Sequence, residues 1–113
     1  MSANRRRGEI AAILDGRERR LCLTLGALAE LEAAYSAENL SALAVRFSGG
    51  LLSSTDLIRI VGAGLRGAGE PVTDKEVAGM ATEGGVAGFA RIAADLLAAA
   101  FGVTAGEADP QNP

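Results

Sequence analysis

A chain of 113 residues has the size of one domain with a single modest core. It contains one cysteine and no histidine, which excludes an intrachain disulfide, Ser-His-Asp or Cys-His catalysis, and histidine-containing zinc sites. The net charge of −3 divides into +3 over the first twenty residues (six arginines against three acidic residues) and −6 over the rest (five basic against eleven acidic residues), and such an acidic body disfavours nucleic acid over most of its surface.

The apolar pattern predicts three parts. Residues 1–7 are polar and basic, and we expect a flexible arm there. Residues 8–102 form a single domain, with a hairpin at 8–24 and helices within 25–102. Residues 103–113 are small and polar with two prolines, which predicts a disordered tail. The expected fold class is α+β and mostly α, with an N-terminal antiparallel β-hairpin packed on a cluster of about five short helices.

The hairpin is indicated by alternating apolar residues on both sides of an Asp-Gly pair. Its register stays open between two loops. A two-residue loop pairs Leu14 with Arg17, whereas a four-residue loop pairs Ala12 with Leu21. We favour the longer loop because it places apolar residues opposite one another. Both loops turn the same face inward.

The helices are predicted mainly from their capping residues. Thr24 stands where the period of the apolar residues changes from that of a strand to that of a helix, and it is the expected first N-cap. Asn39 is the expected N-cap of a second helix, while Ser53 and Thr73 open two more, each with an acidic residue three positions later as in a capping box. The last helix is predicted at about 86–101, and Gly102 ends it.

One motif invites a nucleotide-binding interpretation, because residues 62–67 spell G-x-G-x-x-G after an apolar run. In a dinucleotide site these glycines bring the backbone close to a pyrophosphate at the start of a helix. Here no helix follows, and too little chain remains for the parallel strands of such a fold. We therefore favour close helix packing for Gly62, Gly64 and Gly67, and we predict no cofactor.

Other candidate sites have simpler explanations. The N-terminal Arg5, Arg6 and Arg7 could contact phosphates, but no aromatic residue lies among them to stack on bases, and a solvated end is the preferred interpretation. Cys22 lies in a predicted strand and is expected to be a small core residue. The carboxylates have neither the spacing of an acid-base pair nor that of a metal site, so we predict no catalytic residue and no metal.

The last helix is the best candidate for contact with another protein. It has the longest amphipathic run in the chain, and five short helices with one hairpin offer more apolar faces than a small core uses. The expected partner-binding residues are Val86, Phe89, Ala93, Leu97 and Phe101.

Several segments resemble one known family. RGE followed by a turn at LDG, then LTLGALAELE, AGLRGAGE, VTDKEVAGM and EGGVAGFARIAADLLAAAFG are similar to gene transfer agent tail assembly chaperone-like proteins of alphaproteobacteria, which are relatives of tailed-phage tail proteins. The resemblance covers about residues 7–102, and LTLGALAELE with AGLRGAGE is its most specific part. The family has also been labelled a tail tube protein.

The resemblance implies a non-enzymatic protein, encoded with the tail genes of a prophage-like element, that assists tail assembly by binding the tape measure protein. Its expected partners are therefore the tape measure protein and other tail components, with self-association possible and no membrane involved. A structural tail tube component and a DNA-contacting accessory protein are the alternatives. The expected location is the cytoplasm or a virus-like particle.

Overall fold

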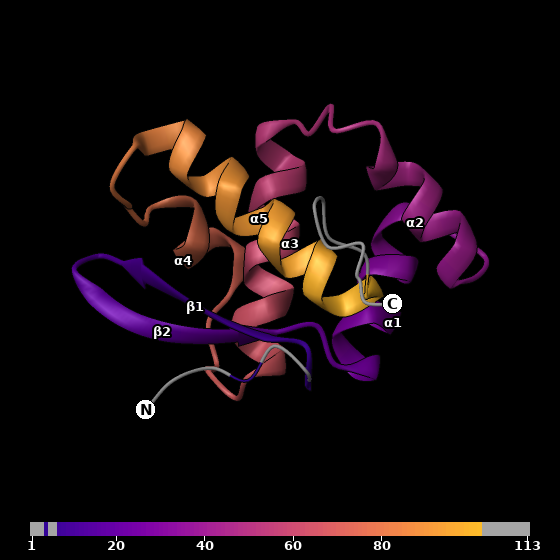
Figure 1. Ribbon diagram of the computed structural model, residues 1–113, viewed down its shortest axis with the longest axis horizontal. Helices are drawn as coiled ribbons and strands as arrows, with labels where there is room; N and C mark the ends of the chain where they lie inside the picture. The colour runs from indigo at the N-terminus through magenta and orange to yellow at the C-terminus, as the bar shows by residue number, and fades with distance from the viewer. Residues whose placement is uncertain (1–3, 5–6, 103–113) are drawn as a thin grey trace, which may run out of the picture.

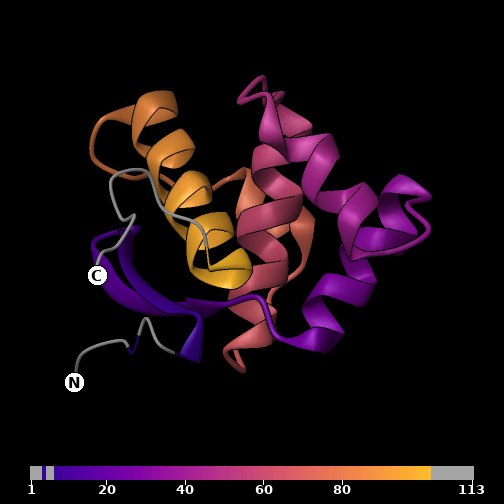
Figure 2. The ribbon, with the colours of Figure 1, turned by 45° about the vertical axis from the view of Figure 1, so that its right-hand side comes forward.

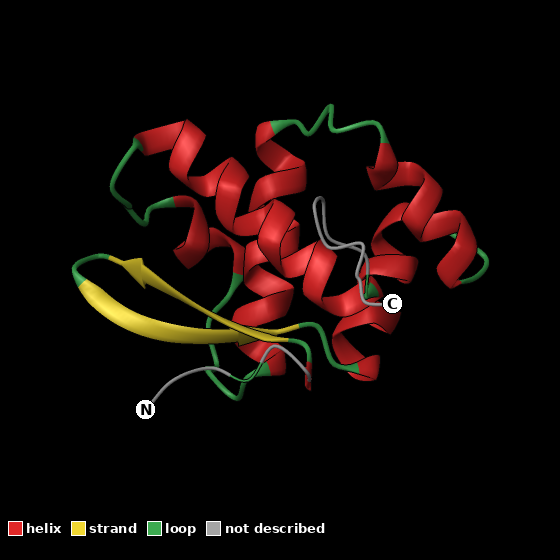
Figure 3. Cartoon of the chain, viewed as in Figure 1, coloured by secondary structure: helices red, strands yellow, loops and turns green. Residues whose placement is uncertain are grey.

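The computed structural model describes residue 4 and residues 7–102, so the predictions for Arg5, Arg6 and the tail at 103–113 lie outside the described residues. Within these described residues, a two-stranded antiparallel sheet precedes five helices, which confirms the predicted fold class. Figures 1 and 3 show the hairpin lying against the helices. None of the described helices combines the length and the apolar character that crossing a bilayer requires. The elements are β1 (Glu9–Leu14), β2 (Arg17–Cys22), α1 (Leu25–Tyr35), α2 (Leu40–Ser48), α3 (Ser54–Gly67), α4 (Asp74–Ala78) and α5 (Gly85–Phe101).

Helix α3 is the centre of the domain. It packs against β2, α1, α4 and α5, and α5 lies beside it in both views of the ribbon (Figures 1 and 2). The hairpin crosses one end of this helix pair, and in Figure 2 α1 and α2 lie on the other side of α3 from α5. Burial of aliphatic side chains from these elements makes the main favourable contribution to the stability of the fold. The largest fully buried side chains are Leu14, Leu21, Leu31, Leu43, Ile60, Val61, Leu65 and Leu96.

The favoured register of the hairpin was wrong. Leu14 pairs with Arg17 across a two-residue loop, and Ala12 lies opposite Arg19. Both loop residues, Asp15 and Gly16, have positive φ angles (55° and 76°), as a type I′ turn requires, and this turn matches the twist of the strands.

Two sets of contacts explain why the shorter loop is tolerated. The turn is held from outside, because the Asp15 backbone N–H donates to Ala81 O at 2.8 Å and the Asp15 carboxylate accepts from Ala81 N at 2.8 Å. Arg19, which faces the protein, donates to Leu14 O at 3.3 Å and forms an ion pair with Glu70 from the α3–α4 loop. The guanidinium of Arg19 therefore has polar partners, although the residue opposite it in the sheet is Ala12.

The predicted caps are confirmed at four helices. Thr24 accepts from Ala27 N at 3.1 Å, and Asn39 accepts from Ala42 N at 2.8 Å. Ser53 and Thr73 each form a complete capping box with the acidic residue three positions later. The helix predicted at about 86–101 begins one residue earlier, and Gly102 adopts the left-handed conformation at its end.

Candidate partner-binding surface

An apolar groove lies between α2 and α5, and we call it the α2–α5 groove. Its volume is about 700 Å³. Aromatic and aliphatic side chains make up much of its wall, and Arg91 is its single charged residue. The lining residues are Ala44, Phe47, Ser48, Gly50, Leu52, Ala90, Arg91, Ala94, Leu97, Ala98 and Phe101. A groove of this composition suits an apolar face of another polypeptide and offers few polar groups to orient a small ligand.

A smaller hollow of about 200 Å³ lies at the other end of α5, between its first turns, α4 and the start of α3. Val77, Met80, Val86 and Phe89 are among its lining residues. Val86 is 76% exposed, so this hollow has a large apolar side chain at its edge.

The structure places the five predicted partner-binding residues in three different surroundings. Leu97 and Phe101 line the α2–α5 groove, and both are half-buried. Val86 and Phe89 line the smaller hollow. Ala93 is fully buried in the core between these two places, so it is not available to a partner in this conformation. The five residues do not form one continuous stripe on the surface.

A cluster around Tyr35 holds α2 in place and so shapes one wall of the groove. The Tyr35 hydroxyl donates to Asp56 at the start of α3, and Arg46 of α2 approaches the same carboxylate at 3.5 Å. Arg46 also lies 4.9 Å from the centre of the Tyr35 ring, which packs edge-to-face on Phe47 at 5.2 Å between ring centres. Arg59 lies over the Tyr35 ring at 5.0 Å. Phe47, a groove residue, is thereby fixed by contacts from α1 and α3.

Two ionisable groups in this cluster have shifted pKa values. Burial, together with the hydrogen bond to the Asp56 carboxylate, raises the pKa of Tyr35 to about 12. Burial by itself would raise the pKa of Asp56, but hydrogen bonds from Tyr35 and Ser53 and the charge of Arg46 outweigh it, so the pKa of Asp56 is lowered. Both shifts keep the tyrosine neutral and the aspartate charged at neutral pH. These groups have a structural role, because their polar atoms are occupied by one another.

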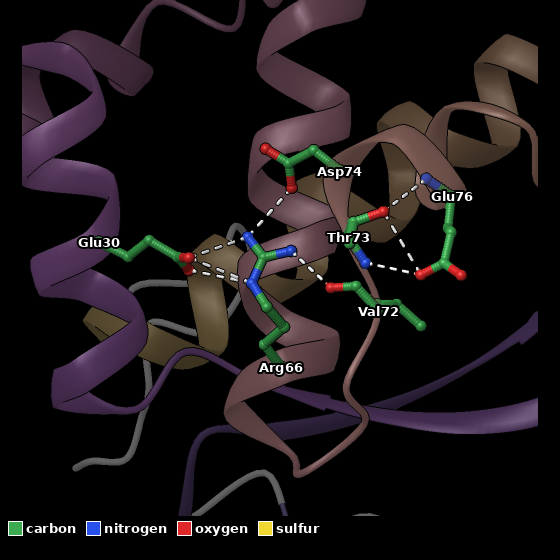
Figure 4. A network of polar contacts seen from close by, with 6 residues as sticks. All are labelled: Glu30, Arg66, Val72, Thr73, Asp74 and Glu76. Carbon is green, nitrogen blue, oxygen red and sulfur yellow. Dashed lines mark hydrogen bonds and ion pairs between the residues drawn. The ribbon is translucent and has the colours of Figure 1, made fainter.

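A second polar network ties α1, α3 and α4 together, as Figure 4 shows. The guanidinium of Arg66 lies 3.1 Å from Glu30 of α1 and 3.0 Å from Asp74 at the start of α4. It also donates to Val72 O at 2.9 Å. The sequence pattern indicated neither this network nor the Tyr35 cluster, because their members are distant in sequence and no spacing rule connects them.

The three motif glycines lie inside α3 and at its end, which confirms the packing interpretation of residues 62–67. A Cβ on Gly62 would lie 2.4 Å from a carboxylate oxygen of Asp74, and one on Gly64 would lie 2.5 Å from Leu96. A Cβ on Gly67 would lie 2.0 Å from the carbonyl oxygen of Cys22. Each glycine thus lets a neighbouring group approach the backbone of α3 closely.

The remaining candidate residues contribute no site within the described part of the chain. Cys22, the last residue of β2, is half-buried, and burial raises the pKa of its thiol, as does the nearby charge of Glu9. A thiol of this kind is a poor nucleophile at neutral pH. Among the described residues, no three cysteine or acidic side chains gather as metal ligands would. Arg7 is exposed, and phosphate contact by the basic arm stays a prediction.

The geometry of these surfaces indicates protein contact but not the biological role, and the sequence match to a known family bears on that role. The sequence model of one family, described as "Phage tail tube protein, GTA-gp10", matches residues 7–103. The chain belongs to this family. Membership makes it a tail-related protein of a gene transfer agent, and it agrees with the resemblance seen in the sequence at that level. No curated protein and no solved structure matches the chain.

Proposed function

We propose that this family member is a structural component of the tail tube of a gene transfer agent particle and that it acts through protein contacts alone, without catalysis. The family description carries this proposal and supports it better than the chaperone role that the resemblance implied. A tube is built from repeated contacts between subunits, and such contacts need apolar surfaces that stay accessible in the monomer.

The surface of the described residues supports a role in protein binding. The α2–α5 groove is apolar and open, and Leu51, next to two of its lining residues, is 90% exposed. Val86 is another large apolar side chain that the monomer leaves uncovered. An exposed apolar surface of this kind commonly marks a binding site for another protein.

Mass spectrometry of purified particles tests the tube proposal. We expect the protein in many copies per particle, at a ratio to the other tail proteins that does not change on further purification. Its absence from intact particles would refute the proposal and would favour a role that ends before the tail is complete.

The second candidate is a tail assembly chaperone that binds the tape measure protein. The α2–α5 groove supports this role, because a groove with an apolar floor can hold the apolar face of an amphipathic helix. Co-expression with the tape measure protein, followed by pull-down, tests it. Retention and a gain in solubility are expected, and both are expected to fall for Ala94→Glu, which puts a charge in the groove.

Ala87→Glu is the matched control for this experiment. Ala87 is exposed on the same helix but does not line the groove, so retention should stay at the wild-type level. Equal retention of both variants would exclude the groove as the binding site, and a complete lack of retention by the wild type would exclude the chaperone role.

A further inference from the structure

Helix α1 has an outward face with few polar groups. Leu25, Ala29 and Ala33 follow one another at four-residue spacing and are exposed, and Leu25 is 78% exposed. The opposite face of the same helix is buried in the core. Glu32 and Glu30 flank the outward face on its two sides, because positions three or four residues apart share one face of a helix. The face is thus an apolar strip with acidic edges.

We infer that this α1 face of one copy docks in the α2–α5 groove of a second copy, so that copies associate head to tail. The inference deepens the tube proposal and rests on it. The two surfaces lie on different elements of the chain, and α1 itself packs on α2 and α3 and not in the groove. Each copy therefore offers one surface of each kind, which is the arrangement that produces rings or filaments.

The two surfaces match in length. Helix α1 has 11 residues and is about 16 Å long. The part of α5 that lines the groove, residues 90–101, rises about 18 Å. Alanines at 90, 94 and 98 form one side of the groove, and small side chains on both helices let the two backbones approach closely.

Charge complementarity selects the partner and the direction. Arg91 is the single charged residue of the groove, and Glu32 stands at the edge of the α1 face. Among the described residues neither Glu32 nor Arg91 has an ion-pair partner within its own chain. Leu25 and Glu32 are seven positions apart on α1, and Arg91 and Ala98 are seven positions apart on α5. An antiparallel alignment of α1 on α5 therefore brings Glu32 near Arg91 and Leu25 near Ala98. The antiparallel alignment also places the positive end of each helix dipole beside the negative end of the other, which is favourable.

The experiment uses the purified full chain and measures its mass over a concentration series by sedimentation velocity and light scattering. The wild type should associate as concentration rises. Ala29→Glu blocks the α1 face and Ala94→Glu blocks the groove. Each should weaken association by more than about tenfold, because each places a bulky carboxylate where the contact needs a small apolar side chain. Ala87→Glu, outside both surfaces, should associate as the wild type does. Circular dichroism verifies that all variants are folded.

Mixing the Ala29→Glu and Ala94→Glu variants tests whether the contact between copies is head to tail. A head-to-tail contact leaves one intact groove and one intact α1 face in the mixture, so a 1:1 dimer should form and nothing larger, and the mean mass should rise about twofold. Exchanging the charges with Glu32→Arg and Arg91→Glu in one chain should restore part of the association that either single change removes.

Three results would overturn the inference: a wild type that stays monomeric throughout, blocked variants that associate like the wild type, or folded blocked variants that form no dimer on mixing. None of these measurements depends on whether particles contain the protein. Many copies in particles together with unaffected blocked variants would therefore refute the α1–groove contact and leave the tube proposal standing.

Discussion

Replacing Gly67 by alanine tests the close packing of α3 on β2. The new Cβ would lie 2.0 Å from the carbonyl oxygen of Cys22, whereas such atoms in proteins essentially never approach closer than 3.0 Å. The gap must therefore open by at least 1.0 Å (3.0 minus 2.0). Cys22 O is a backbone atom, so rotation of a side chain cannot relieve the clash. The end of β2 must move, and it adjoins Leu21 and Leu23, both of which are buried.

The expected magnitude follows from two opposing effects. Forcing additional atoms into a packed core costs roughly 1–3 kcal/mol. Alanine in place of glycine in a helix returns at most about 1 kcal/mol, and less at the last residue of the helix. The net loss of stability is therefore about 1–2 kcal/mol. For a domain of this size that corresponds to a fall of roughly 4–15 °C in the melting temperature.

Urea and thermal denaturation followed by circular dichroism measure this change. Gly26→Ala is the matched control, because the space beside Gly26 in α1 is open, with Thr24 Oγ1 the nearest atom at 3.9 Å. Because no clash arises and alanine favours the helix more than glycine does, the Gly26→Ala variant should be as stable as the wild type or more stable by a few tenths of a kcal/mol. Gly67→Ala with the same or greater stability than this control would show that the close contact between α3 and β2 is absent in solution.

Three further changes test the polar contacts. Thr73→Ala removes the hydroxyl of the α4 capping box and should cost about 1 kcal/mol in urea denaturation, whereas Thr73→Ser should retain most of the stability; equal loss in both would argue against the cap. The lowered pKa of Asp56 stabilises the fold above the ordinary carboxyl pKa, and this contribution is lost as the pH falls through the lowered value. Asp56→Asn should therefore be less stable than the wild type at pH 7, with the difference shrinking below about pH 4; a difference independent of pH would contradict the cited cause. Arg66→Met removes the ion pairs to Glu30 and Asp74 and should lower the melting temperature, and high salt should lower the wild-type value toward that of the variant; a wild type insensitive to salt would count against an electrostatic role.

Short-range patterns in the sequence were sufficient for the elements of the fold. The caps at Thr24, Asn39, Ser53 and Thr73 could be predicted because a capping bond joins residues only two or three positions apart. The same holds for the position of the turn after Leu14, although not for its length, and for the glycine that ends α5. The tail-protein family could also be recognised from the sequence, because residues 7–103 carry its pattern throughout.

The candidate site could be predicted only in part. The amphipathic pattern of α5 identified Leu97 and Phe101, which do line the groove, but it also selected Ala93, which the core encloses completely. A helical period shows which residues share a face, and it does not show how much of that face the neighbouring elements cover. Phe47, which lines the groove, packs on Tyr35 of α1, and that contact joins residues twelve positions apart that no local pattern links.

The hairpin register illustrates the same physical limit. Matching apolar residues across the strands favoured the longer loop, whereas partners more than fifty positions away, Glu70 for Arg19 and Ala81 for Asp15, stabilise the shorter one. Hydrogen bonds and charges within a few residues leave their mark in the local sequence. Contacts between distant residues depend on where the packed core brings the chain together, and so they were decided by the folded arrangement of α3, α5 and the hairpin.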